Sequence, residues 1–234
     1  MDMIAKQRLE RRAAILATAR EMIAEVGYEA VKVRELAERC RVSVPTLYNQ
    51  FGGKDGLLAA AIEDHFVGVM NGAALARADS GFKRLLAIID QCALEMLTLS
   101  AYHQRLLEAF MSLESTTAVQ QRIAVQLTEA IERELLTMRG ERQLAEWVAP
   151  RLIAEQLTSA CINASVIWSS GLFSDASLRP TMRFSTGLVL LGAIRGKSHA
   201  LLQARVRAAQ KLLVRARAQA EASTHKQIKE IRHG

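Results

Sequence analysis

The chain has 234 residues, of which 50% are hydrophobic, and its formal net charge is +7 at pH 7. This length suits one or two domains with a sizeable core. The uninterrupted apolar run of about 18 residues that a membrane span requires does not occur, and the first residues lack the apolar segment of a secretion signal. We therefore expect a cytoplasmic protein that does not enter a membrane.

The cysteines and prolines narrow the class of protein further. Cys40, Cys92 and Cys161 are odd in number and widely spaced within apolar helical patterns, which favours buried thiols over disulfides. A redox-sensing role for these thiols is the less favoured alternative. The histidines and cysteines show no spacing typical of a metal site. Because only three prolines and few runs of β-branched residues occur, the chain is predicted to be all-α. No cofactor is expected.

The first predicted helix ends at Gly27, a residue type that is common just beyond helix C-termini. Its apolar residues recur every three or four positions, as on one face of an amphipathic helix. They are Leu9, Ala13, Leu16, Ala19, Ile23 and Val26. We expect this helix to pack across two shorter helices that follow it.

Residues 33–54 read VRELAERCRVSVPTLYNQFGGK and predict two short helices joined by a turn. The apolar face of the first helix consists of Val33, Leu36, Ala37 and Cys40. Ser43 can cap the second helix by accepting from free backbone N–H groups, and Pro45 suits its first turn. Leu47 and Phe51 lie four residues apart and are predicted to face the core.

The rest of this second helix is predicted to face outward. These residues are Val44, Pro45, Thr46, Tyr48, Asn49 and Gln50. A helix of about two turns has little structural reason to expose such a set, whereas an α-helix of this size fits the major groove of DNA. The pair is therefore interpreted as a helix-turn-helix with a recognition helix in second place.

The segment SVPTLYNQFGGKDGLL resembles the signature of the tetracycline-repressor (TetR) family of bacterial transcription regulators, and the resemblance extends from Arg11 to Phe66. It implies a three-helix helix-turn-helix DNA-binding domain over residues 1–53 and a linker helix over residues 54–79. A helical effector-binding and dimerisation domain would cover residues 80–200, and residues 201–234 would form a basic helical tail.

The resemblance also implies which residues contact DNA. Thr46, Tyr48 and Lys54 are expected to hold phosphates, whereas Arg34, Asn49 and Gln50 are expected to read bases, since Asn and Gln pair with adenine and Arg with guanine. The full expected set is Arg34, Ser43, Val44, Pro45, Thr46, Tyr48, Asn49, Gln50 and Lys54.

Two residues beside the motif depart from the family pattern. Arg41 occupies a position that usually carries glycine, where a left-handed backbone would cost a non-glycine residue roughly 1–2 kcal/mol. Lys32 stands where a capping threonine is usual, and its side chain cannot accept a hydrogen bond. Both changes add positive charge next to the recognition helix.

The body is predicted to begin near residue 80 and to contain four or five longer helices. Their expected ranges are 82–99, 102–113, 117–138, 141–170 and 181–223. Pro150 should kink or restart the fourth of them. Residues 171–180 read GLFSDASLRP and are predicted to form a loop, and Gly196 is a weak point in the last helix.

Segments Leu152–Leu172 and Met182–Ile194 are apolar over more than one face. The resemblance implies that the last two body helices pair with their copies in a second subunit. Burial in one large core is the alternative. We favour a homodimer, because a helix-turn-helix regulator reads a near-palindromic site with two-fold symmetry.

The tail carries most of the excess charge, because residues 195–234 hold ten Lys and Arg residues against two acidic ones. Its apolar seam consists of Leu202, Val206, Ala209, Leu213 and Ala216. This seam favours a solvated basic extension of the last helix that packs on the body. Extra contact with DNA or with other anionic cell components is the alternative.

The resemblance further implies a small apolar or amphipathic effector inside the body. Candidate lining residues are Met96, His103, Phe110, Met111, Trp147, Asn163 and Trp168. Each of them is also explained as an ordinary core or hydrogen-bonded residue. The sequence does not identify the effector.

Together these patterns predict a sequence-specific transcription regulator, most simply a repressor that a ligand releases from a double-stranded DNA operator. A weakly specific nucleoid-type binder that uses the basic tail is the alternative, although the exposed pair Asn49 and Gln50 argues against it. An enzyme is not expected, because the sequence offers no nucleophile–base arrangement, phosphate-binding glycine loop or paired carboxylates in an apolar pocket.

Overall fold

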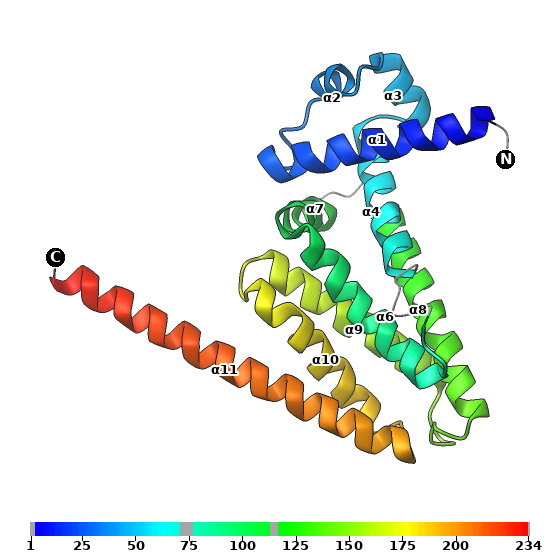
Figure 1. The fold of residues 1–234 in the computed structure, drawn as a ribbon, viewed down its shortest axis with the longest axis vertical. Coiled ribbons are helices and arrows are strands. Elements are labelled where there is room, and N and C mark those ends of the chain that lie inside the picture. Colours follow the sequence, from blue (N-terminus) through cyan, green and yellow to red (C-terminus); the bar gives the residue numbers. More distant parts are fainter. Residues whose placement is uncertain (1–2, 71–76, 113–116, 234) are drawn as a thin grey trace. The chain divides into compact units, whose positions relative to one another are not determined.

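The computed structural model describes residues 3–70, 77–112 and 117–233, which form helices joined by short connections (Figure 1). The predicted all-α fold class is thereby confirmed. Helix packing divides the chain into two compact units. We call residues 1–72 and 95–126 the N-terminal unit, and residues 73–94 and 127–234 the C-terminal unit.

This division by packing differs from the predicted division by function. Its boundaries fall inside α6 (Gly81–Thr98) and α8 (Thr117–Gly140), and α7 (Ser100–Ser112) belongs to the N-terminal unit. The predicted boundary between residues 200 and 201 lies within α11 (Lys197–His233), which is continuous there. The functional domain boundaries therefore stay a prediction.

Helices from the start of the chain enclose the core of the N-terminal unit. They are α1 (Met3–Val26), α2 (Val33–Arg39), α3 (Val44–Phe51) and α4 (Lys54–Met70). α1 packs against α2, α4 and α7, as Figure 1 shows, and α3 packs against α2 and α4. As predicted, α1 ends at Gly27, which has a left-handed φ of 78° and donates its N–H to the Ile23 carbonyl at 2.9 Å.

Three helices pack side by side in the C-terminal unit. They are α9 (Pro150–Ser169), α10 (Asp175–Leu191) and α11. α10 lies between the other two, and α11 folds back along it (Figure 1). The largest side chain buried here is that of Trp168, whose Nε1 donates to the Asp175 Oδ1 at 2.9 Å and so joins α9 to the start of α10.

The predicted helix over residues 141–170 is wrong in its first third. α9 begins at Pro150, which occupies the first helical position, where a missing N–H costs little. Residues 141–149 instead form a connection whose backbone bonds to the α10–α11 connection. The Ala145 N–H donates to the Ala193 carbonyl and the Arg195 N–H to the Gln143 carbonyl, both at 2.8 Å. These long-range bonds replace the helical ones.

Two further expectations about the last helices are wrong. The predicted loop over residues 171–180 ends early, because α10 starts at Asp175 and contains Pro180. The predicted helix over residues 181–223 is divided, since α10 ends at Leu191 and Gly196 has a φ of 68° before α11 starts. Gly196 is therefore part of a chain reversal, which lets α11 pack on α10.

The seam predicted for the tail is buried in its first half. Leu202, Val206 and Ala209 are almost fully covered where α11 packs on α10, whereas Leu213 and Ala216 further along the seam are half-buried. Gly187 of α10 lies opposite this seam, and a Cβ built on it would stand only 2.3 Å from Val206 Cγ2. The two helices approach closely there because position 187 has no side chain.

Replacing Gly187 by alanine should therefore destabilise the protein. The added methyl group overlaps a stiff β-branched side chain, so the helices must separate or Val206 must rotate, at a cost of about 1–3 kcal/mol. Chemical denaturation measures the change. The double variant Gly187→Ala with Val206→Ala should be more stable than addition of the two single effects predicts, and simple additivity would contradict the close approach.

One carboxylate in the C-terminal unit faces three arginines. Asp90 of α6 accepts from Arg183 Nε and Nη2 at 2.7 Å each and from Arg179 Nη2 at 3.2 Å. Arg205 Nη2 of α11 lies 2.6 Å from the same carboxylate. The Asp90 side chain is only 16% exposed. This cluster joins α6, α10 and α11 through a single negative charge.

Two of the cysteines are buried as predicted, and Cys40 is half-buried. A hydrogen bond with Cys92 and burial together raise the pKa of the Cys161 thiol. Such a thiol stays protonated and is a poor nucleophile. Within the described residues, no single helix is long and apolar enough to cross a membrane, and Gly81–Thr98 with Ser100–Glu108 meets that test only as a pair bent by 99°.

Candidate nucleic-acid interface

Apolar residues anchor the helix pair α2–α3 in the hydrophobic core. Leu36 and Ala37 of α2 are buried, and so are Leu47 and Phe51 of α3, as the spacing predicted. α2 begins after Lys32, whose side chain makes no capping hydrogen bond. The orientation of α3 therefore depends mainly on packing and on its own cap.

The cap of α3 forms as predicted. Ser43 Oγ accepts from the Thr46 backbone N–H at 3.2 Å and lies 2.8 Å from Thr46 Oγ1. Pro45 stands in the first turn. At the other end, Gly52 has a φ of 76° and donates its N–H to the Tyr48 carbonyl at 2.7 Å. Both ends of the helix are thus fixed by local hydrogen bonds, so the outward residues have a defined direction.

The turn between the helices contains a strained residue. Arg41 has a φ of 54°, in the left-handed region that favours glycine. Its N–H donates to the Glu38 carbonyl at 3.1 Å, and the Val42 N–H donates to the Ala37 carbonyl at 3.0 Å. This pair of bonds is the Schellman ending of α2. The side chain of Arg41 is exposed and lies just before the recognition helix in the sequence.

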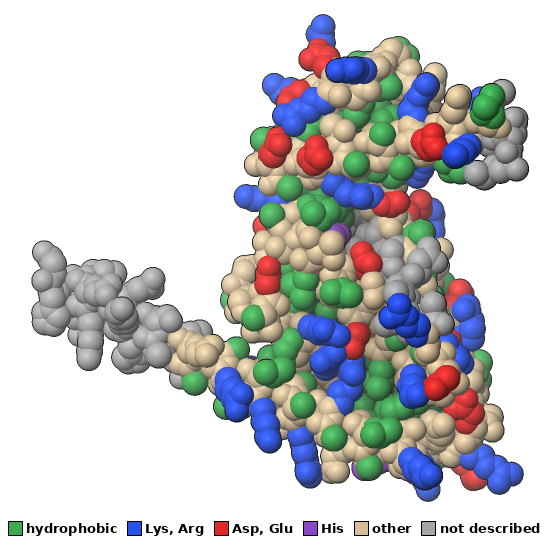
Figure 2. All heavy atoms as spheres, viewed as in Figure 1, with side chains coloured by type: hydrophobic (Ala, Val, Ile, Leu, Met, Phe, Trp, Pro, Cys, Tyr) green, Lys and Arg blue, Asp and Glu red, His purple; other side chains and the backbone are tan. Residues whose placement is uncertain are grey.

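Most of the expected DNA-contacting residues lie on one exposed surface of the N-terminal unit. Ser43, Pro45, Tyr48 and Asn49 are exposed, and Thr46 and Gln50 are half-buried. Val44 differs from its predicted outward position, because it is half-buried and packs against the hydrophobic core. Figure 2 shows acidic side chains interspersed with basic ones over this unit, in agreement with its small net charge.

The two basic residues of the expected set, Arg34 and Lys54, differ in how far their side chains are held by other residues. The Arg34 side chain is 87% exposed and lies 3.7 Å from Glu38 of the same helix. Lys54 Nζ donates to the Glu29 carbonyl at 2.7 Å and lies 4.6 Å from the centre of the Tyr28 ring. An ammonium has three donors, so Lys54 keeps donors for a phosphate while it holds the connection between α1 and α2.

Replacing Arg41 by glycine tests whether this strained residue serves DNA. Relief of the left-handed strain, less the extra chain entropy of glycine, should raise the free energy of unfolding by about 0.5–1 kcal/mol. Loss of one cation should weaken binding to any duplex and lower the salt slope by about one. Arg142→Gly is the matched control, since Arg142 has a φ of 57° in the C-terminal unit. An unchanged salt slope for Arg41→Gly would exclude a phosphate contact.

The effector candidates do not gather around one cavity. Met96 and His103 lie together in the N-terminal unit, where His103 Nδ1 is 3.1 Å from the Met96 carbonyl oxygen. In the C-terminal unit, Asn163 is exposed, the Trp147 side chain is 72% exposed and Trp168 is fully buried. The side chains of Phe110 and Met111 lie outside the described residues.

His103 lines a small pocket in the N-terminal unit with a volume of about 210 Å³. Its walls come from α1, α4, α7 and the end of α6. The lining residues are Arg20, Ala61, Asp64, Glu95, Thr98, Leu99, Tyr102 and His103. Arg20 of α1 and Asp64 of α4 form an ion pair across these helices. Burial lowers the pKa of His103 to about 4, so its ring is neutral at pH 7.

Sequence reasoning found His103 but missed the other lining residues. Arg20 lies in the predicted DNA-binding domain and Asp64 in the predicted linker helix, and both are charged, so hydrophobic periodicity gave no reason to place them at a pocket. Their opposite charges would have been the available signal, but residues 44 positions apart in the sequence become neighbours only through packing.

Comparison with known proteins shows which family has a similar helix-turn-helix. Residues 15–61 match the family profile described as bacterial regulatory proteins, tetR family. The chain is 26% identical to the transcriptional activator FasR of Mycolicibacterium smegmatis over 76% of this chain and 82% of that protein. It is 29% identical to the transcriptional repressor KstR of Rhodococcus jostii, over 51% of this chain and 56% of that protein.

Solved structures share the fold over about four fifths of this chain. SmeT, the repressor of the Stenotrophomonas maltophilia multidrug efflux pump SmeDEF, superposes with a TM-score of 0.65 at 20% identity. The match covers 80% of this chain and 92% of SmeT. A TetR transcription regulator from Haloarcula marismortui matches with a TM-score of 0.67 at 13% identity, over 80% of this chain and 99% of that protein. The helix-turn-helix of this chain thus matches that of the tetR family of bacterial regulatory proteins, and the chain has the fold of TetR-family regulators.

Proposed function

We propose that this regulator is a homodimeric repressor that binds a near-palindromic operator and is released by a small ligand. The observation that carries the proposal is the α3 surface, a capped helix that exposes Tyr48 and Asn49 while Leu47 and Phe51 anchor it. Tyr48, Thr46 and Lys54 would hold phosphates, and Asn49, Gln50 and Arg34 would read base edges. Ser43, Val44 and Pro45 would set how closely the helix enters the groove.

Exposed apolar residues on α9 and α10 support the dimer. Leu152 and Ile162 of α9 are 61% and 37% exposed, and Leu188 of α10 is 51% exposed. A second copy that packs on α9 and α10 would cover these side chains. In such a homodimer, each recognition helix would read one half-site of an operator whose half-sites are about 34–36 Å apart, or a multiple of that spacing.

The pocket beside His103 supports release by a ligand. Its helices α1 and α4 are the ones that pack around the helix pair α2–α3. Its volume of about 210 Å³ is smaller than that of usual small-molecule sites, which begin near 300 Å³. A ligand that enters would therefore have to separate α1, α4 or α7. Such a shift would alter the orientation of α3 and reduce operator affinity.

Selection of bound duplexes from a random DNA pool, followed by sequencing, tests the proposal. We expect a two-fold symmetric motif with two half-sites. Retention of random DNA without an enriched motif, with binding that disappears at moderate salt, would overturn it. That result would instead support a weakly specific binder that uses the basic tail, since residues 195–234 hold ten of the 31 Lys and Arg residues.

A further inference from the structure

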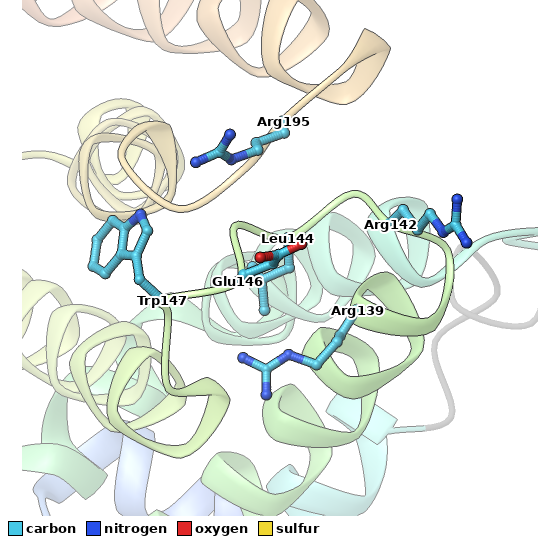
Figure 3. A pocket seen from close by; sticks show the side chains of 6 residues that line it. All are labelled: Arg139, Arg142, Leu144, Glu146, Trp147 and Arg195. Carbon is cyan, nitrogen blue, oxygen red and sulfur yellow. The ribbon is translucent and has the colours of Figure 1, made fainter.

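A second pocket lies in the C-terminal unit, at the place where two connections meet. It is formed by residues 139–147, at and after the end of α8, and by the connection between α10 and α11, and its volume is about 790 Å³. Figure 3 shows its lining side chains, which are Arg139, Arg142, Leu144, Glu146, Trp147 and Arg195. This volume falls within the usual range for small-molecule sites.

The backbone of this pocket is held in place by bonds between its two walls. Leu144 and Ile194 form an antiparallel bridge, and the Arg195 N–H donates to the Gln143 carbonyl at 2.8 Å. Ser198 Oγ of α11 donates to Gln143 Oε1, also at 2.8 Å. Residues some 50 positions apart are thereby fixed together, so the pocket exists before any ligand binds.

The charge of the pocket is unbalanced. Its walls carry three arginines and one acidic residue, Glu146. Arg139 donates to the Val148 carbonyl, but within the described part of the chain no carboxylate forms an ion pair with Arg139, Arg142 or Arg195. Other arginines of the same unit, such as Arg84, are paired with carboxylates. The pocket therefore offers guanidinium donors to an anion.

The pocket also exposes an aromatic ring. The Trp147 side chain is 72% exposed, whereas Trp168, the other tryptophan, is fully buried. An indole left in water forgoes a large gain from burial, and its face suits stacking with a planar ring. In Figure 3 the guanidinium groups of Arg139 and Arg195 lie on the side of the Trp147 ring, while that of Arg142 points away.

The residue at the edge of the pocket is strained. Arg142 has a φ of 57°, and its N–H donates to the Arg139 carbonyl at 3.0 Å as part of the ending of α8. Glycine is the usual residue at such a position, and a non-glycine costs roughly 1–2 kcal/mol. Backbone strain of this kind concentrates at functional sites, which agrees with a role for the pocket.

We infer that this pocket binds a nucleoside phosphate. The base would stack on Trp147, and the phosphates would accept from Arg195 and Arg139. The site is separate from the α3 surface and from the pocket beside His103, which both belong to the N-terminal unit. It therefore stands whether or not the proposed repressor function is correct.

Calorimetric titration of the full-length protein with ATP tests this inference. Trp147→Ala and Arg195→Ala should each weaken binding about tenfold or more. Both residues are exposed, so these variants should fold normally. Arg133→Ala is the matched control, because Arg133 is exposed on α8 and lines none of the pockets described above, and it should change affinity less than twofold.

Adenosine and inorganic tripolyphosphate test the contributions of the base and of the phosphates separately. Each should bind at least about tenfold more weakly than ATP, since each engages only the ring or only the arginines. Tripolyphosphate that binds as tightly as ATP would overturn the inference in favour of a simple anion site. An equal loss of affinity in Arg133→Ala, or no ATP binding at millimolar concentration, would also overturn it.

Discussion

Replacing Asp90 by asparagine should lower the free energy of unfolding by about 3 kcal/mol, a large fraction of the stability of a single domain. Asparagine has the same shape but no charge, so the guanidinium groups of Arg183 and Arg205, each 25% exposed, would lose their counter-ion. The effect should be large because removal of one partner leaves the other charges desolvated. Denaturant unfolding of the variant, followed by circular dichroism, measures the loss.

Acid should reproduce part of this effect. Burial alone would raise the pKa of Asp90, but hydrogen bonds from Arg183 and the charge of Arg205 outweigh it and lower the pKa from 3.8 to about 2. Because the folded-state pKa lies below the unfolded one, the stabilisation is complete above pH 3.8 and is lost as the pH falls through about 2. The pH dependence of unfolding in this range should be weaker in Asp90→Asn.

Asp79→Asn is the matched control for the charge change. Asp79 pairs with Lys83 at 2.8 Å, but its side chain is 70% exposed, and exposed pairs contribute little. Its stability should therefore stay close to that of the parent protein. A loss of similar size in both variants would show that the Asp90 cluster has no special role in joining α6, α10 and α11.

Replacing Asn49 by alanine should weaken binding to the selected operator about tenfold or more while binding to random duplexes stays the same. An amide that pairs with adenine contributes about 1–3 kcal/mol of discrimination, and this contribution exists only at the matching base. Asn49 is exposed on α3 and is therefore free to reach a base edge. Titration of labelled duplexes with the operator and with single-base variants measures both affinities.

Comparison with Tyr48→Phe distinguishes recognition of bases from contact with phosphates. The Tyr48 side chain is 52% exposed, and its hydroxyl would donate to a phosphate, a group present in every sequence. Its removal should lower affinity for operator and random DNA by the same factor. An equal loss on all sequences from Asn49→Ala would exclude base reading by that residue, even if the operator itself is real.

The sequence alone determined the features that depend on residues within a turn or two of each other. The cap by Ser43 and the buried pair Leu47 and Phe51 follow from such spacings. The left-handed backbone at position 41 was instead expected from the family resemblance, because the family usually carries glycine there. Helix periodicity and capping are local, because the atoms that satisfy the free N–H groups lie only a few residues away. The family resemblance rests on this same local segment.

The tertiary structure alone decided what depends on distant residues. Local composition indicated a loop where α10 begins and a continuous helix across Gly196, yet packing of α11 on α10 and bonds between residues 143–145 and 193–195 gave different boundaries. The same holds for the arginines around Asp90 and for Trp147, which was expected at an interior site and is largely exposed. Their partners lie tens of residues away in the sequence. A local sequence pattern does not indicate which distant residues will become neighbours once the helices pack.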